Sequence, residues 1–128
     1  MKKVLVSIRN GLLSEAIVRS LRDCGEFLPY PLSSETCTNI TEQCKAVDAD
    51  IVLMEVSYLP GATVEVRLKE IRQIRNSNPG CKIAVLCDEN ATPELAYKVT
   101  QLKRDHLIDS FFYTSVTANY LMSTLASL

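Results

Sequence analysis

The 128-residue chain has only one histidine and four glycines, and its five cysteines include no Cys-x-x-Cys pair. Zinc sites usually combine cysteines and histidines at short spacing, so this composition excludes them. A phosphate cradle needs several glycines, and the segment Ser7–Gly11 after the first apolar run has one. We therefore expect no metal ion and no cofactor, and we expect the cysteines to be buried or partly buried free thiols, with Cys87 packed in the core.

The chain also lacks a long apolar run and an excess of charge of either sign. Arg9 interrupts the apolar residues near the start, which leaves a segment too short for a signal peptide or a membrane span. Fourteen Lys and Arg against fifteen Asp and Glu give a net charge of -1, so the chain has no general attraction for nucleic acid or an anionic bilayer. These features predict a cytoplasmic protein that contacts neither nucleic acid directly nor a membrane.

The overall composition is that of a globular protein, with 47% hydrophobic and 23% charged residues. The length suits one domain over residues 1–128. Short apolar segments, typical of buried strands, alternate with segments whose apolar residues recur at helical spacing. The expected strands are Lys3–Ile8, Phe27–Leu32, Asp50–Glu55, Lys82–Cys87 and Leu107–Tyr113.

Cap residues mark the ends of the intervening helices. The expected helices begin after Asn10, at Ser34, at Val64 after a turn at Pro60-Gly61, after Thr92 and after Thr117, and the first ends at Gly25. Asparagine and threonine are favoured N-caps, and glycine commonly follows the last helical residue. The third helix carries basic residues that we expect on a solvated face, namely Arg67, Lys69, Arg72 and Arg75.

Strands that alternate with helices form a mainly parallel sheet with helices on both faces. The sequence thus predicts an α/β fold with a single, doubly wound, five-stranded parallel sheet. Pro29 and Pro31 cannot donate to a ladder, so the second strand is expected at an edge. The expected core includes Val4, Leu5, Val6, Ile51, Leu53, Ile83, Val85 and Leu86. Functional residues are expected in the loops at the carboxyl ends of the strands, at 7–10, 55–61, 87–90 and 113–115.

The third predicted strand carries a family resemblance. Asp50-Ile51-Val52-Leu53-Met54-Glu55, followed by Pro60-Gly61, resembles the response-regulator receiver family, in which such a run ends in the phosphoacceptor aspartate. Lys2–Val6 is similar to the family's first strand, and Asp109–Tyr113 is similar to its fifth. The resemblance implies a receiver-like fold with flavodoxin-type strand order and a role in signal transduction.

The sequence departs from the family at the residues that carry the chemistry. The family holds Mg²⁺ with two acidic residues after the first strand and with the acceptor aspartate, and it ends the fourth and fifth strands with Thr or Ser and with Lys. The matching residues here are Ile8, Arg9, Glu55, Cys87 and Thr114. The resemblance therefore implies a degenerate receiver, a pseudo-receiver that is not an enzyme and lacks Mg²⁺-dependent aspartyl phosphorylation.

Two residues of this degenerate site have two interpretations each. Glu55 either stands in for a permanently charged acceptor or is a polar residue tolerated at a strand end. Arg9 is either an exposed loop residue or a cation that faces Glu55; in the second case, family-like strand adjacency places the two within reach of a charge-assisted hydrogen bond. Such a bond would hold the acceptor site locked.

Without a phosphorylation switch, regulation is expected to come from protein contacts, either with a partner or in a weak homodimer. The candidate surface is mixed aromatic and polar and includes Tyr97, Lys98, Gln101, Arg104, Phe111, Tyr113 and Tyr120. Phe111 matches the family's switch aromatic, although simple packing also explains it. An output domain beyond Leu128 fits the same role. Two alternatives stay open: a working phosphoacceptor that uses Glu55 or Asp88 in a phosphorelay, and a small α/β enzyme.

Overall fold

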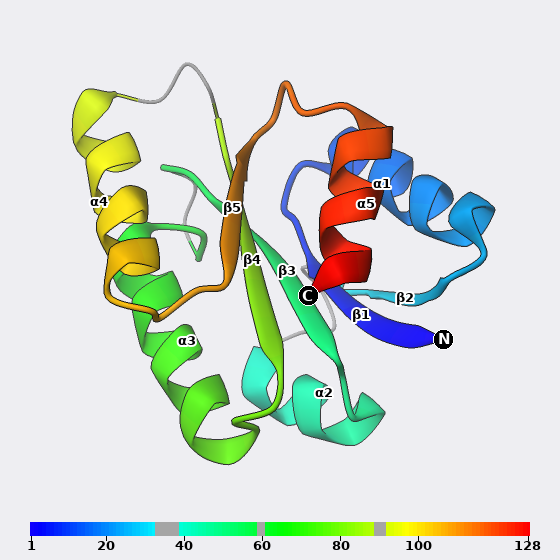
Figure 1. The fold of residues 1–128 in the computed structure, drawn as a ribbon. Helices are drawn as coiled ribbons and strands as arrows, with labels where there is room; N and C mark the ends of the chain where they lie inside the picture. Colours follow the sequence, from blue (N-terminus) through cyan, green and yellow to red (C-terminus); the bar gives the residue numbers. More distant parts are fainter. Residues whose placement is uncertain (33–38, 59–60, 89–91) are drawn as a thin grey trace.

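A computed structural model describes residues 1–32, 39–58, 61–88 and 92–128 (Figure 1). Five strands alternate with five helices along the chain. The strands are β1 (Lys2–Ser7), β2 (Phe27–Pro31), β3 (Ile51–Val56), β4 (Lys82–Cys87) and β5 (Ser110–Tyr113). The helices are α1 (Gly11–Cys24), α2 (Ile40–Val47), α3 (Val64–Ser77), α4 (Pro93–Arg104) and α5 (Ala118–Ser127). In the described part of the chain, no helix is long and apolar enough to cross a membrane.

The strands form one sheet in the order β2-β1-β3-β4-β5, and every neighbouring pair is parallel. Helices α1 and α5 cover one face, and α2, α3 and α4 cover the other (Figure 1). This is the doubly wound, flavodoxin-type order that was predicted, with the proline-containing β2 at an edge. Because all strands run the same way, the carboxyl ends of β1, β3, β4 and β5 lie next to one another. We call this end of the sheet its carboxyl edge.

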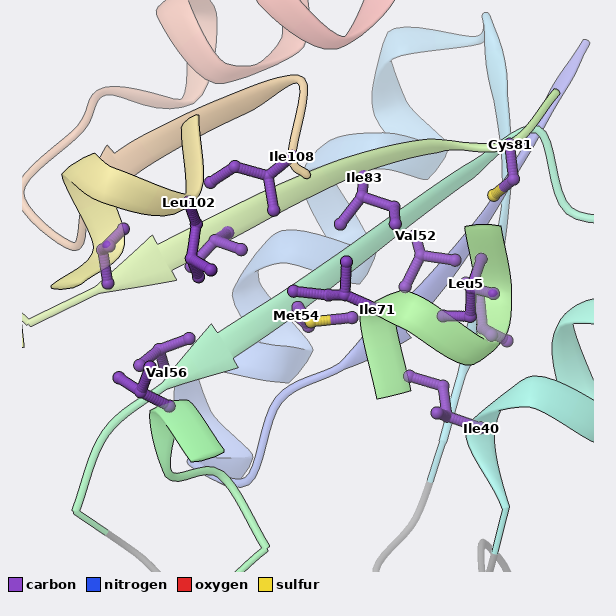
Figure 2. Close-up of a cluster of buried hydrophobic side chains, with 14 of the residues drawn as sticks. Leu5, Ile40, Val52, Met54, Val56, Ile71, Cys81, Ile83, Leu102 and Ile108 are labelled. Carbon is purple, nitrogen blue, oxygen red and sulfur yellow. The ribbon is translucent and has the colours of Figure 1, made fainter. Parts of the chain in front are cut away.

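Each face of the sheet has its own apolar core. Alternate side chains of a strand point to opposite faces, so Leu5 and Val52 pack toward α2 and α3 while Val4 and Leu53 pack toward α1 and α5. Figure 2 shows the first of these cores, where Ile71 of α3 lies over the middle of the sheet. All eight predicted core residues are buried, and the strand β3 is buried along its whole length.

Four predicted helix ends are confirmed. The Asn10 side chain accepts a hydrogen bond from the backbone N–H of Leu13, and Gly25 follows α1 with a φ of 76° in the left-handed region. Thr92 and Thr117 cap α4 and α5 with their side chains. These ends follow from local chemistry, because the first backbone N–H groups of a helix have no partner inside it.

Other boundaries differ from the prediction or lie outside the described residues. The strand β5 begins at Ser110 rather than Leu107, because the chain closes α4 with a hydrogen bond from the Leu107 N–H to the Leu102 carbonyl. Asn39 caps α2 and the helix begins at Ile40, whereas the predicted start at Ser34 lies outside the described residues. Predictions for Cys37, Pro60 and 89–90 concern residues that the structure does not describe.

The predicted solvated face of α3 is only partly right. Lys69 and Arg72 are exposed, but Arg75 is half-buried and holds the end of the sheet opposite the predicted site. Its guanidinium donates to the carbonyls of Leu107 and Cys81 at 3.1 Å each and forms a 2.9 Å ion pair with Asp109. The interpretation of Arg75 as a solvated residue was therefore wrong, because two backbone carbonyls near the sheet end and the Asp109 carboxylate take up all three of its nitrogens.

Candidate functional site at the carboxyl edge of the sheet

Glu55 lies at the carboxyl edge of the sheet, where the sequence placed an acceptor-like carboxylate. It is the fifth residue of β3 and its exposed fraction is 8%. One carboxylate oxygen, Oε1, accepts a hydrogen bond of 2.9 Å from the backbone N–H of Arg9, in the loop after β1. Arg9 and Glu55 are therefore in contact, as the predicted adjacency of their strands implies, but the hydrogen-bond donor is the backbone N–H of Arg9 and not its guanidinium.

The Arg9 guanidinium lies elsewhere. In the described ranges, no ion pair joins it to Glu55. It packs against Gly61 so closely that a Cβ on that glycine would come within 2.1 Å of Nη2 of Arg9. Gly61 also has a φ of 83°, which suits glycine. The side chain of Arg9 thus crosses from the β1–α1 loop to the β3–α3 loop over a residue without a side chain.

Arg67 is the residue at this edge that sequence reasoning missed. Its exposed fraction is 2%, so its prediction as a solvated residue of α3 was wrong. Its guanidinium donates from Nε to the Glu55 carbonyl at 2.8 Å and from Nη2 to the Ser7 carbonyl at 3.0 Å. Nη1 donates to the Ser7 hydroxyl at 3.0 Å and to Glu70 at 3.1 Å. One buried cation therefore joins the ends of β1 and β3.

The signal that could have identified Arg67 is its position in the helix. Val64, Ile71 and Ile74 form the buried stripe of α3, and Arg67 falls at the helical spacing of that stripe. An arginine on a buried face needs partners, because an unpaired buried charge is costly. Burial lowers the pKa of Arg67 and raises the pKa of Glu70, and the ion pair between them opposes both shifts.

The other predicted site residues are spread over the two faces of this edge. Ile8 is 5% exposed and packs in the core under α1 and α5, so it presents no polar group to the site. Cys87 is 1% exposed in the other core, and burial raises the pKa of its thiol. Thr114 is half-buried, and its backbone N–H donates to the Cys87 carbonyl at 3.0 Å. Asp88 is exposed after β4.

The residues at this edge do not fit a Mg²⁺ ion. Magnesium needs several hard oxygen ligands in octahedral geometry. Of the three positions that match the family's acidic residues, Ile8 is packed in the core, Arg9 is cationic and only Glu55 is a carboxylate. Across residues 1–32, 39–58, 61–88 and 92–128, no group of three or more His, Cys, Asp or Glu could hold a metal ion.

The candidate contact surface lies on α4, β5 and α5. Its tyrosines are exposed, with Tyr97 at 64%, Tyr120 at 62% and Tyr113 at 42%. Phe111 is half-buried and meets Tyr113 edge to face with ring centroids 5.9 Å apart. Lys98 instead forms an ion pair of 3.2 Å with Glu65 of α3. Gln101 is half-buried and Arg104 is exposed.

No protein-family model matches the sequence, and no curated protein matches it. Solved structures do match. The signal receiver domain of the response regulator NarL from Mycobacterium tuberculosis has a TM-score of 0.72 at 16% identity, over 98% of this chain and 94% of that one. The chemotaxis protein CheY4 from Vibrio cholerae has a TM-score of 0.72 at 13% identity, over 99% and 98%.

A third match comes from a longer chain. RcsB from Salmonella enterica serovar Typhimurium, in a structure bound to the promoter rprA, has a TM-score of 0.68 at 17% identity, over 98% of this chain and 67% of that one. At these identities the likeness establishes the fold alone. The chain therefore has the fold of response-regulator receiver domains.

Proposed function

We propose that this chain, which has the receiver fold, is a pseudo-receiver: a signalling domain without Mg²⁺-dependent aspartyl phosphorylation that acts through protein contacts. The proposal includes a cytoplasmic location and an output domain beyond Leu128 or a separate partner. The promoter-bound RcsB chain offers a precedent for a longer protein that contains this fold.

The observation that carries the proposal is the arginine at the edge where the family has its acidic metal site. The buried guanidinium of Arg67 bonds the main-chain carbonyls of Ser7 and Glu55 at 3.0 and 2.8 Å. It supplies a permanent positive charge inside the protein, and Arg9 supplies another at the surface. These two cations, and the loss of two of the three carboxylates of the family's site, disfavour a divalent ion, and phosphoryl transfer relies on such an ion to neutralise the charge that develops.

The state of Glu55 supports the same function. Its side chain is buried, and one carboxylate oxygen already accepts the Arg9 N–H. An acceptor must present an oxygen in line with the incoming phosphoryl group, and this packing restricts that approach. The contact between the β1–α1 loop and β3 is then permanent rather than switched.

We place the contact surface on α4, β5 and α5. Exposed aromatic side chains that also carry a polar group are common in interfaces. The three exposed tyrosines of this surface have that character. Gln101 and Arg104 add polar groups on α4. Lys98 belongs to its margin, because its ammonium is paired with Glu65 toward α3.

Two measurements on the wild-type protein test the proposal. Mg²⁺ at millimolar concentration is expected to leave the melting temperature unchanged, because a ligand that binds the native state would raise it. Acetyl phosphate with Mg²⁺ is expected to give no adduct of phosphate mass on the intact protein. A receiver domain that keeps the acidic pair serves as the positive control. A phosphate adduct mapped to Glu55 or Asp88 would instead establish a working phosphoacceptor.

Substitutions toward the family's residues distinguish two explanations for the absence of phosphorylation: the loss of the acceptor aspartate alone, and the loss of the metal ligands and the lysine as well. Glu55→Asp alone is expected to stay unlabelled, because it supplies no metal ligand beyond the one it replaces. The combination Ile8→Asp, Arg9→Asp, Glu55→Asp and Thr114→Lys restores the family's charges. It also places a carboxylate where Ile8 now packs, so the folded fraction must be measured together with labelling. Labelling of Glu55→Asp alone would contradict the proposed loss of the metal site.

A further inference from the structure

Two buried cysteines face each other at the end of the sheet opposite the candidate site. Cys44 of α2 and Cys81, directly before β4, lie 37 positions apart in the sequence, and their sulfurs are 3.8 Å apart. Each has an exposed fraction of 1%. Figure 2 shows Cys81 at the start of β4, in the core that also contains Cys44.

We propose that Cys44 and Cys81 form a thiol–disulfide redox pair, which two-electron oxidants such as hydrogen peroxide convert to a disulfide that joins α2 to the start of β4. This site is independent of the proposed signalling function. Sulfur atoms already in contact need only a modest rotation of the side chains to reach bonding distance, which is about 2 Å.

The surroundings of the pair favour one of the two sulfurs as the nucleophile. Asn78 donates from Nδ2 to Sγ of Cys44 at 3.4 Å. The hydrogen bond with the Cys81 thiol, together with this amide, lowers the pKa of Cys44 to about 7 although burial opposes the shift. The same contact raises the pKa of Cys81, which therefore keeps its proton. The thiolate is the reactive form of cysteine, so Cys44 reacts first.

The chemistry balances with hydrogen peroxide as the oxidant. The Cys44 thiolate attacks one peroxide oxygen, the O–O bond breaks, and hydroxide leaves as Cys44 becomes a sulfenic acid. The sulfur of Cys81 then attacks the Cys44 sulfur, the S–S bond forms, and the sulfenic oxygen leaves as water with the Cys81 proton. In total, two thiols and one peroxide give one disulfide and two waters.

Access to the pair depends on α2. This helix has eight residues, a length at which a helix has little stability of its own. Local opening of such a short element exposes buried groups without global unfolding. A small uncharged oxidant can then reach sulfurs that are covered in the closed state. Cys24 is exposed, so the expectation that the cysteines are buried or partly buried was wrong for this residue. It provides an internal reference for oxidation that needs no opening.

The test is mild oxidation of the folded wild-type protein with hydrogen peroxide, followed by peptide mapping without reduction. Cleavage after Lys45 and Lys82 releases Cys44 and Cys81 in separate peptides, so a disulfide links the two, and fragmentation assigns the cysteine. We expect this link, the loss of two of the five thiols and a melting temperature higher by about 5 °C or more, since the disulfide closes a long loop.

Single substitutions provide matched controls. Cys24→Ala is expected to keep the link, whereas Cys44→Ala and Cys81→Ala are expected to lose both the link and the rise in melting temperature. If either buried variant fails to fold, the map of the wild-type protein decides. Oxidation of Cys24 without the link, or a link from Cys44 to Cys37, would overturn the proposal.

Discussion

At the scale of single residues, Arg67 has more influence on this molecule than its place on a helix predicts. Its guanidinium makes four hydrogen bonds to acceptors on β1, β3 and α3, and two of these acceptors are main-chain carbonyls. Truncation would leave buried acceptors without a donor and Glu70 without its cation. The cost of such a loss exceeds the modest net contribution of the hydrogen bonds themselves.

We therefore expect Arg67→Ala to lower the free energy of unfolding by about 2–4 kcal/mol. Arg67→Lys should recover only part of this, because an ammonium cannot reproduce the planar fork of the guanidinium. Urea denaturation measures both. Arg72→Ala is the matched control on the exposed side of the same helix and should change the value by less than about 0.5 kcal/mol. Equal effects of Arg67→Ala and Arg72→Ala would show that the network does not stabilise the fold.

Arg9 illustrates the opposite case, in which a charged residue contributes through its main chain. Because its backbone N–H makes the hydrogen bond to Glu55, Arg9→Ala keeps that bond and should change stability by less than about 0.5 kcal/mol. Glu55→Ala removes the acceptor and should cost about 1–3 kcal/mol, whereas Glu55→Gln keeps an oxygen and should cost less. Thermal or urea unfolding compares the three variants. A large effect of Arg9→Ala would mean that the guanidinium itself holds the edge together.

At the scale of elements, the start of α4 combines a local signal with a tertiary contact. Thr92 caps the helix through its side chain, which accepts the Leu95 N–H, and the same hydroxyl is hydrogen-bonded to the Tyr58 hydroxyl in the β3–α3 loop. Pro93 then occupies the first helical position, where its missing N–H costs nothing. The cap thus ties α4 to the loop after β3 at the edge that carries the candidate site.

Thr92→Ala is expected to lower stability by about 1 kcal/mol and to increase amide hydrogen exchange at the start of α4. Tyr58→Phe removes only the contact between the hydroxyls and should leave the cap in place. Thr117→Ala, at a cap that serves α5 alone, is the comparison for a purely local loss. If Thr92→Ala leaves exchange in α4 unchanged, the helix start depends on packing rather than on the cap.

At the scale of the whole molecule, the receiver fold separates its two ends. The carboxyl edge contains Arg9, Glu55 and Arg67, whereas Cys44 of α2 and Cys81, directly before β4, lie at the opposite end of the sheet. Each end is held by a buried or half-buried arginine of α3, Arg67 at one and Arg75 at the other. The helix α3 therefore fixes both ends of the sheet.

Association through α4, β5 and α5 belongs to this scale as well. We expect the double variant Tyr97→Glu and Arg104→Glu to weaken self-association or partner binding, since both residues are exposed on α4. Sedimentation velocity over a concentration series measures self-association. Arg19→Glu, at an exposed position of α1, is the control for charge alone. Dissociation by Arg19→Glu with no effect of the double variant would place the interface on the other helices.

The sequence alone was sufficient for the fold class, the strand order, the edge position of β2 and most helix ends. The fold class, the edge position of β2 and the helix ends depend on periodicity, proline chemistry and caps, all of which act over a few residues of chain. The strand order came instead from the resemblance to the receiver family. The eight predicted core residues were right for the same reason, because strands such as Ile51–Val56 are apolar without interruption. The candidate edge could also be named, since parallel strands must end together.

Only the tertiary structure decided what fills that edge and what lies at the other end. Arg67 and Arg75 look like solvated helix residues until β1, β3 and the loops before β4 and β5 bring carbonyls within reach of their guanidinium groups. Cys44 and Cys81 are 37 positions apart, and no local pattern relates them. Which partners a buried charge or thiol meets depends on contacts between distant segments, and those contacts exist only after the chain has folded.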